Sequence, residues 1–472
     1  MSLPFSSSKK EPAGFLLVLV LVMGSVFLMI ISGFIGYVVT QNQVVNFRFE
    51  QQRATEIAEA GLNYYRWYLA HYPDDVTNGT GMPGPYVHQY DDPEGSAMGE
   101  FSLDIASSTY CGDISSIEIA STGHTYAEPD AKSTVRGQYS RPSVASYSFV
   151  TNSGVWYGPS SNVNGPIHTN QGIRMDASHN SIVSSGQTDW TCDGSYGCSP
   201  TQTVDGVFTT SGNANPALFS FPTAPIDFNG VTLDLAVMQD RAQNQGGLYF
   251  PDSGKAGYHV IFQPGNQVEV RRVNAKQNEP SGYAWGRYLN ILKGTSLVGV
   301  YNIDPTCPVI YFEDQVWLEG QVDQKVSNAA ADIDTAGVDP SIILNNNITY
   351  GSPDAGLLAV AEFDMLIGLE VPEDMELNGI FVAQTGHFGR NFYDTSMPNS
   401  WEEYIIRDSL TINGTIVSNS RAGYNWVYSS GVLASGFENS ESSYDASQVF
   451  DPPPYTPITS DVYSFFNWRQ DG

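Results

Sequence analysis

The sequence Phe15-Leu-Leu-Val-Leu-Val-Leu-Val-Met23 opens a run, Phe15–Val39, that contains no charged residue and no proline. At about 1.5 Å per helical residue, this run spans roughly 37 Å. That length is enough to cross a hydrocarbon core of about 30 Å with some tilt. A buried core helix seldom stays apolar for so long, so the run predicts a membrane-spanning helix that contacts the lipid bilayer.

The hydrophobic pattern changes towards residue 50 without a helix breaker. Small and apolar residues then recur at three- and four-residue spacing, with charged residues between them, which is the pattern of an amphipathic helix. Tyr72-Pro73 ends it. We therefore expect one helix over residues 15–72, apolar in its first half and striped in its second. The stripe consists of Ala54, Ile57, Ala58, Gly61, Leu62, Tyr65, Tyr68 and Leu69.

Charge on the two sides of the apolar run predicts its orientation. Lys9 and Lys10 precede the run, and the next basic residue after it is Arg48. Because the positive flank tends to stay in the cytoplasm, a short cytoplasmic N-terminus and an extracytoplasmic C-terminus are expected. A cleaved secretory signal has a shorter apolar core followed by a small-residue cleavage site, which this sequence lacks.

The composition of the whole chain limits its partners. Fifty acidic residues against 21 basic ones give a net charge of −29. Such a surface repels nucleic acid, so nucleic-acid binding is not expected. After residue 73 turn-forming residues are abundant and long helical patterns are rare, which favours a largely β exterior.

Alternating strands follow a Gly- and Pro-rich loop that begins at residue 73. The alternation is that of short antiparallel strands with one covered face, and the striped helix is the expected cover. Residues 73–148 are therefore predicted to form a small antiparallel β head. The residues that alternate are Phe101, Leu103 and Ile105, then Ile117 and Ile119, then Val135 and Tyr139.

The N-terminal third resembles type IV pilins, and minor pilins in particular. The resemblance rests on the leader that ends in Gly14-Phe15, the unbroken apolar helix, and the segments Ala54–Asn63 and Ile119–Gly123. It implies that residues 1–14 are a leader, cut between Gly14 and Phe15 by a prepilin peptidase, and that other pilin subunits are partners. The family usually carries a glutamate where this chain has Leu19, so a plain signal anchor remains the alternative.

A short pattern recurs after residue 148: an apolar residue, then Asn, Asp or Glu, then Gly, then a further apolar residue one or two positions on. Each copy can bend a strand tightly, and stacked coils would bury one continuous interior. Residues 149–420 are therefore predicted to form a parallel β-helix display domain, with a β-sandwich as the alternative. Three segments of this region, Tyr157–Asn170, Leu357–Phe388 and Leu410–Ser418, also resemble β-helical exodomains found behind pilin-type helices in bacterial surface proteins. The copies are Val163–Ile167, Val204–Phe208, Leu318–Val322, Leu377–Phe381 and Ile412–Ile416.

Further strands and two inserts complete this region. Val309–Phe312, Ile342–Leu344, Leu357–Val360 and Met365–Ile367 are expected to add strands, and Asn345–Asn347 can form an interior asparagine ladder. A short surface helix is predicted over Val231–Gln243. Residues 421–472, rich in Pro and Tyr, are expected to close the β-helix as a cap or tail.

Four cysteines in an extracytoplasmic chain invite pairing. Cys192 and Cys198 lie six residues apart in a glycine-containing loop, so a disulfide between them is predicted. Cys111 and Cys307 fall in different predicted domains, so each is expected to be a buried free thiol, with a bridge between them as the less favoured alternative.

The sequence carries no motif of an enzyme, metal site or cofactor site that we can identify. The seven histidines have no metal-ligand spacing. Asp332-Ile-Asp334-Thr-Ala-Gly337 begins like a calcium loop, but Ala336 and Ile343 replace oxygen ligands, so a turn is expected. The predicted function is a non-enzymatic, membrane-anchored surface protein that binds surface glycans or proteins and acts in adhesion. The alternative is a membrane-tethered β-helix enzyme, a polysaccharide lyase or hydrolase.

Overall fold

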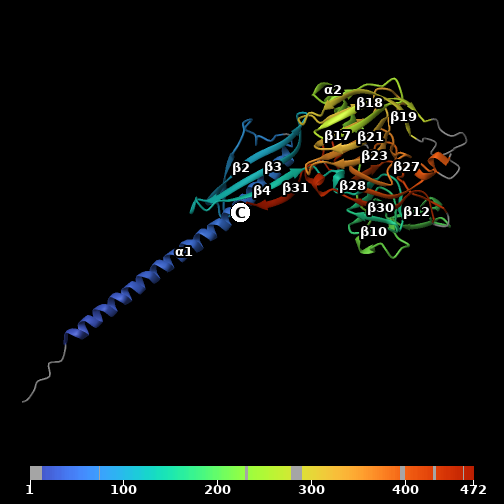
Figure 1. Ribbon diagram of the computed structural model, residues 1–472. Helices are drawn as coiled ribbons and strands as arrows, with labels where there is room; N and C mark the ends of the chain where they lie inside the picture. Colours follow the sequence, from blue (N-terminus) through green and yellow to red (C-terminus); the bar gives the residue numbers. More distant parts are fainter. Residues whose placement is uncertain are drawn as a thin grey trace, which may run out of the picture.

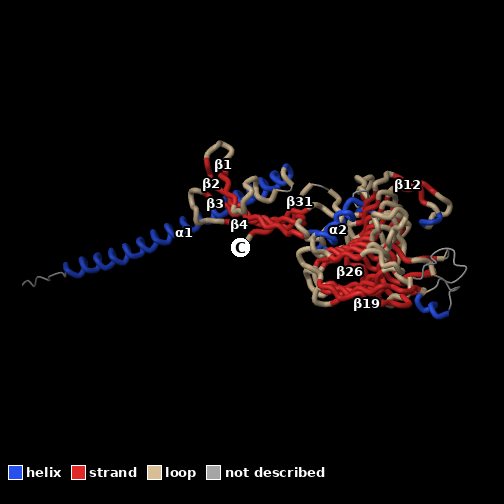
Figure 2. The backbone as a smooth tube through the Cα atoms, turned by 90° about the horizontal axis from the view of Figure 1, so that it is seen from above, coloured by secondary structure: helices blue, strands red, loops and turns tan. Residues whose placement is uncertain are grey.

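The computed structural model describes residues 13–73, 75–228, 232–277, 290–393, 399–428, 432–460 and 462–471. A long helix, a small antiparallel sheet and a larger β region follow one another along the molecule (Figure 1). Figure 2 shows the small sheet between the helix and the larger region from a second direction. The predicted leader lies outside the described residues except for its last two positions, Ala13 and Gly14.

The predicted long helix is confirmed as α1, Ala13–His71. Its first half projects away from the rest of the chain, and its second half packs on the small sheet (Figure 1). Every residue of the predicted stripe is buried. Helix and sheet approach closely at Gly123, where a Cβ atom would lie 2.3 Å from the carbonyl oxygen of Ala54. Gly123 therefore has to remain a glycine for the two backbones to meet.

The small sheet, here called the head sheet, is antiparallel throughout. Phe101, Leu103, Ile117, Ile119 and Val135 point from it into one core with α1. The predicted alternation is thus confirmed, and the covering element is the expected one. In spatial order its strands are β1 (Tyr86–Asp91), β2 (Ala97–Tyr110), β3 (Asp113–Thr125), β4 (Ser133–Ser140) and β31 (Ser464–Gln470).

The larger β region is built mainly from parallel ladders, with antiparallel strands added to them. The first ladder is continuous and parallel from end to end. Its strands, in spatial order, are β16 (Leu248–Phe250), β20 (Val309–Phe312), β22 (Lys325–Ala330), β24 (Gly356–Ala361), the ends of β26 (Asp374–Ala383) and β28 (Ile406–Ser418), then β5 (Phe149–Thr151), β8 (Ile167–Thr169), β11 (Val183–Ser185) and β15 (Phe219–Ser220).

Two further parallel ladders are linked to the first, because the third ladder shares β26 and β28 with the first and β21 and β23 with the second. The second contains β17 (Tyr258–Gln263), the start of β21 (Val316–Val322), the start of β23 (Ile342–Tyr350), β25 (Met365–Ile367) and β27 (Phe388–Arg390). The third contains the ends of β21 and β23, the starts of β26 and β28, β30 (Leu433–Ser443), β7 (Ser161–Asn164) and β10 (Ser178–His179). A separate parallel sheet joins β6 (Val155–Tyr157), β9 (Ile173–Met175) and β14 (Val207–Phe208).

Antiparallel pairs make the sheets mixed. Strands β18 (Gln267–Lys276) and β19 (Leu292–Asn302) extend β17, while β29 (Trp426–Val427) pairs with β30. A hairpin joins β12 (Asp189–Cys192) to β13 (Gln202–Asp205). The short helices are η1 (Val144–Ser146), η2 (Gly194–Tyr196), η3 (Pro216–Leu218), α2 (Thr232–Asn244), η4 (Asn399–Tyr404) and α3 (Ala446–Phe450).

The chain enters the first ladder in its middle. It runs from β5 through β8 and β11 to β15 at one end, and α2 then leads to β16 at the opposite end. From there it returns strand by strand until β28 pairs with β5, with Ile416 opposite Phe149. One apolar interior therefore runs through both halves, from Val163 and Ile167 to Leu344 and Ile412.

The outer face of the first ladder is buried as well. Tyr311, Leu358, Ile380 and Val417 pack there under α2, which contributes Leu235, Met238 and Ala242. The predicted surface helix is confirmed as α2, although Val231 lies outside the described residues. A segment with Pro452–Tyr455 crosses the same face, where the Ser327 hydroxyl donates to the carbonyl of Pro454.

Repeated Asn-Gly pairs bend strands without ending them. Asn378-Gly379 and Asn413-Gly414 lie in register within β26 and β28, with φ of +154° and +139° at the glycines. The Asn413 amide donates to Asn378 Oδ1 at 3.0 Å. A Cβ atom on Gly414 would lie 1.9 Å from the carbonyl oxygen of Gly379, so the stacking requires glycine.

The asparagine ladder forms at a place that we did not predict. Asn345 donates to Glu319 and Asn346 is exposed, so residues 345–347 bulge outwards instead of stacking inside. Asn170 instead donates to Asn152, which donates to Asn419, each at 2.8 Å. This second set of contacts crosses the junction between β28 and β5.

The C-terminal residues differ from the predicted cap. Strand β30 lies inside the third ladder, between β28 and β7. Strand β31 pairs with β4 and completes the head sheet. Strand β7, beside β30, and strand β4, beside β31, lie more than 200 residues away in sequence, so local composition could not indicate these two pairings.

Ile412 allows a test of the shared interior. Its side chain is 1% exposed, so Ile412→Asp buries an unpaired charge, which costs several kcal/mol. We expect loss of the cooperative thermal transition of the β region, measured by circular dichroism. Arg272→Ala, at an exposed position of β18, is the control and should melt like the wild type. Wild-type melting of Ile412→Asp would contradict the stacked core.

Candidate functional site

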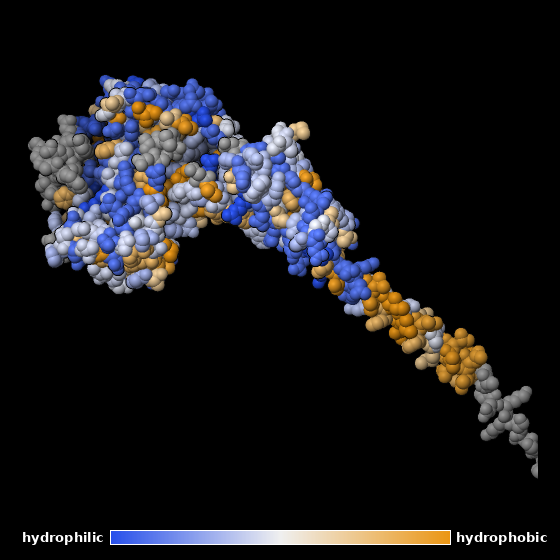
Figure 3. All heavy atoms as spheres, turned by 180° about the vertical axis from the view of Figure 1, so that it is seen from behind, coloured by the Kyte–Doolittle hydropathy of each residue, from blue (hydrophilic) through white to orange (hydrophobic). Residues whose placement is uncertain are grey.

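The apolar half of α1 is the most exposed hydrophobic surface of the molecule. Each large apolar side chain from Phe15 to Val39 is 37–74% exposed. By length and composition, this helix can cross a membrane. Figure 3 shows its apolar surface on the part of α1 that projects from the head. No protein contact within the described chain covers this surface.

Exposed apolar side chains continue beyond the predicted span. Val44, Val45, Phe47 and Phe49 are 40–60% exposed, and the first charged residue after the span is Arg48. Burial begins near Ala54, where α1 meets the head sheet. The helix therefore has a surface without partners that is longer than the predicted membrane span.

The predicted processing site lies at the beginning of α1. Gly14 is in the first helical turn, and the Phe15 side chain is 72% exposed. Lys9 and Lys10 lie outside the described residues. Leu19 is 52% exposed on the same apolar surface.

The hairpin between β2 and β3 connects the head to the larger β region through a disulfide. Cys111 is bonded to Cys307 across 196 residues of sequence. The expectation of two free thiols was therefore wrong, because it assumed that residues of different domains lie too far apart. The Cys111 N–H also donates to the carbonyl of Thr306 at 2.7 Å. Both the backbone and the side chain of Cys111 therefore connect the hairpin to the larger β region.

An ion pair lies two residues from this disulfide. Arg241, in the last turn of α2, donates to both oxygens of Asp113 at 2.9 and 3.1 Å. The Tyr455 hydroxyl donates to the same carboxylate at 2.8 Å. Burial raises the pKa of Asp113, but these hydrogen bonds and the charge of Arg241 outweigh burial, and the pKa is lowered. Three distant segments thus meet at one carboxylate.

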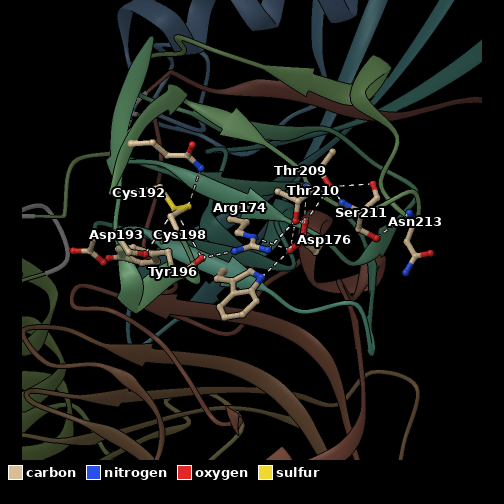
Figure 4. Close-up of polar contacts among 12 residues, drawn as sticks. Arg174, Asp176, Cys192, Asp193, Tyr196, Cys198, Thr209, Thr210, Ser211 and Asn213 are labelled. Carbon is tan, nitrogen blue, oxygen red and sulfur yellow. Dashed lines mark hydrogen bonds and ion pairs between the residues drawn. A yellow bond between two sulfur atoms is a disulfide. The ribbon is translucent and has the colours of Figure 1, made fainter. Parts of the chain in front are cut away.

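The second cysteine pair lies at the far end of the β region. A disulfide joins Cys192 to Cys198 in the β12–β13 hairpin (Figure 4). Trp190 packs against this pair in a small cluster of its own. Next to it, the Arg174 guanidinium lies over the Trp156 ring, 4.5 Å from its centroid, and donates to the carbonyl of Tyr196.

Asp176 is the most enclosed carboxylate of this region (Figure 4). It accepts hydrogen bonds from Arg174 Nε at 2.7 Å, from Trp156 Nε1 at 3.0 Å and from the Thr210 N–H at 2.8 Å. Burial raises its pKa, but the Thr210 N–H and Arg174 outweigh burial and lower it. Both of its oxygens are occupied by protein donors, so Asp176 stabilises this end of the β region and has no free oxygen for a substrate.

Arg390 is a buried cation whose partners are carbonyl oxygens. Its side chain is 1% exposed and donates to the carbonyls of Gly368, Leu369, Tyr404 and Ile405. Burial lowers the pKa of Arg390 to about 10. Its donors are used within the fold, so it also stabilises structure. Within the described ranges, no group of three or more His, Cys, Asp or Glu residues is arranged to hold a metal ion.

Comparison with known proteins gives similarity to solved structures but to no sequence family. No protein-family model and no curated protein sequence matches the chain. Among solved structures, it is similar to the crystal structure of the competence-associated pilin ComZ from Thermus thermophilus. The similarity covers 89% of this chain and 97% of that chain, with 12% sequence identity and a TM-score of 0.29. A TM-score this low does not establish a shared fold.

The two disulfides should differ in their effect on stability. In the chain-entropy model, the bond across 196 residues contributes about 5 kcal/mol and the bond across six about 2 kcal/mol. Replacing Cys111 and Cys307 by Ser should therefore lower the midpoint of thermal unfolding more than the same change at Cys192 and Cys198. Non-reducing peptide mapping should recover both linkages. Equal shifts, or a free thiol at any of the four positions, would contradict the arrangement.

Proposed function

We propose that this chain is a pilin-like surface protein, held by α1 and displaying its β region outside the cytoplasm. One observation carries the proposal. The same helix is exposed and uncharged over Phe15–Val39 and buried on the head sheet from Ala54 to Leu69. Such a helix needs an apolar environment for its first half while its second half fixes a water-soluble head.

We further propose that α1 packs with helices of other subunits, beyond anchoring in the bilayer. The uncharged segment from Phe15 to Phe47 is about 50 Å long at 1.5 Å per residue. A tilt of about 20° lengthens the path through a 30 Å hydrocarbon core to only about 32 Å. Val44, Val45 and Phe47 would then face water in a simple anchor, whereas neighbouring pilin-type helices in a filament would cover them.

For the display domain, the three parallel ladders support stacked coils of a parallel β-helix. A β-sandwich is built from two face-to-face antiparallel sheets, and its pairing pattern differs from these ladders. The proposed domains are a leader over 1–14, the helix over 15–72, the head over 73–148 and the β-helix from 149. Because β30 belongs to the third ladder, the β-helix extends past residue 420 to 443.

Display for adhesion is favoured over catalysis. The enclosed Asp176 and Arg390 satisfy their hydrogen-bonding groups within the fold, as described above. Partners in this proposal are surface glycans or proteins, together with pilin subunits and a prepilin peptidase. The enzyme alternative requires a carboxylate pair open to a polysaccharide, and Asp176 does not offer one.

Substitutions at Val45 and Phe47 distinguish a filament subunit from a simple membrane anchor. Changing both to Gln removes exposed apolar surface but leaves Phe15–Val39 intact. We expect the variant to remain in the membrane fraction, with residues beyond 73 removable by protease added to intact cells. It should be depleted from sheared filaments, because its helix surface no longer fits its neighbours.

The matched control changes Met82 and Val87, which are similarly exposed on the head, to Gln. This control should enter filaments as the wild type does. A wild-type protein that is found only as a membrane-bound monomer would contradict the filament proposal. Protection of residues beyond 73 from protease would contradict the topology.

Cleavage between Gly14 and Phe15 is a separate proposal. N-terminal sequencing of the mature protein should give Phe15 as its first residue. A Gly14→Val variant should keep its leader, because pilin-type processing depends on the residue before the cut. A wild-type protein that begins at Met1 or Ser2 would leave only the signal-anchor version.

A further inference from the structure

The junction between the head and the C-terminal segment contains a cavity of about 180 Å³. Tyr110 and Ser115, from the β2–β3 hairpin, line it together with Pro453 and Tyr455 of the C-terminal segment. Arg141 and Tyr463 also line the cavity. A cavity of this size is smaller than a drug-sized site and suits a ligand of one ring.

Arg141 is the unusual group in this cavity. The residue as a whole is partly exposed, but its Nε atom is buried and has no hydrogen-bond partner, and no described carboxylate forms an ion pair with its guanidinium. The guanidinium lies over the Tyr463 ring, 5.2 Å from its centroid. A buried charged donor without a partner is costly, whereas a bound anion with two oxygens would satisfy it.

The carboxylate and hydroxyl groups that line the cavity limit the chemical class of ligand that it can bind. Asp113 is already paired with Arg241 and Tyr455, so it does not neutralise Arg141. The hydroxyls of Tyr110 and Ser115 make no hydrogen bond to any described residue. Proline and tyrosine side chains form the walls. The cavity therefore offers one cation, two hydroxyls and apolar ring faces.

We infer that this cavity binds a single sugar ring that carries a carboxylate, such as a uronic acid residue of a surface glycan. The carboxylate would pair with Arg141, the ring hydroxyls with Tyr110 and Ser115, and the ring C–H groups with the tyrosine and proline faces. The inference deepens the display function proposed above and rests on it for the source of the sugar.

Titration calorimetry on the full-length chain in detergent tests this inference, with D-glucuronate as the probe at 0.15 M salt. D-Glucose lacks the carboxylate, and acetate lacks the ring. We expect saturable binding of glucuronate, and binding of glucose and acetate at least about tenfold weaker, because each loses one set of contacts. Acetate binding as tightly as glucuronate would show a simple anion site and overturn the inference.

Substitutions of lining residues test whether glucuronate binds in this cavity. Arg141→Met should weaken glucuronate binding by at least about tenfold, and Tyr110→Phe should weaken it by a smaller factor. Arg272→Met, at an exposed position of β18, is the matched control and should bind as the wild type does. If Arg141→Met does not fold, the double variant Tyr110→Phe with Ser115→Ala replaces it, and it should also bind glucuronate more weakly than the wild type.

No binding to the folded wild-type chain, or binding that neither Arg141→Met nor the hydroxyl variants change, would overturn the inference. The result is independent of filament assembly. A chain that binds glucuronate through Arg141 but never enters filaments would contradict the proposed function alone.

Discussion

The pairing of β28 with β5 is the constraint on which the larger β region depends. It joins Ile416 to Phe149, so the first and last parts of this region become neighbours. Without it, each half of the first ladder would end in an open strand edge, and the apolar interior would be divided. The contacts from Asn170 to Asn152 and from Asn152 to Asn419 reinforce the same junction with side-chain hydrogen bonds.

The same pairing decides where the chain enters and leaves. Because β5 lies in the middle of the ladder, the linker from the head arrives there, and β30 brings the chain out beside β7. The departing segment then crosses the outer face of the first ladder and reaches β4 as β31. Together with Cys111–Cys307 and the Asp113–Arg241 pair, these links connect the head and the β region at several points.

The two halves of helix α1 have different surroundings. Its buried stripe uses α1 as part of the head core, so the head cannot separate from the helix without losing that core. The large apolar side chains of its first half, by contrast, are exposed, and no other part of the described chain covers them. In the β region, the enclosed charges of Asp176 and Arg390 are satisfied by hydrogen bonds within the fold.

The sequence by itself determined the features that rest on local periodicity. The uncharged run of α1, its stripe, the alternating head strands and the Asn-Gly bends at Gly379 and Gly414 follow from residue spacing and backbone sterics. The sequence also repeats a Thr-Asn or Ser-Asn pair, at Thr151, Thr169 and Ser418, and we did not recognise these pairs as turns from the sequence. The hydroxyls of Thr151 and Thr169 each accept a hydrogen bond from the backbone N–H two residues further along the chain.

Tertiary structure alone decided the pairings between distant segments. The Cys111–Cys307 bond, the Asp113–Arg241 pair and the position of β31 beside β4 all join residues whose local sequence gives no signal of the partner. Such contacts depend on how whole ladders stack and on where the chain enters them. That order is set by the total buried surface of the fold, which no short stretch of sequence encodes.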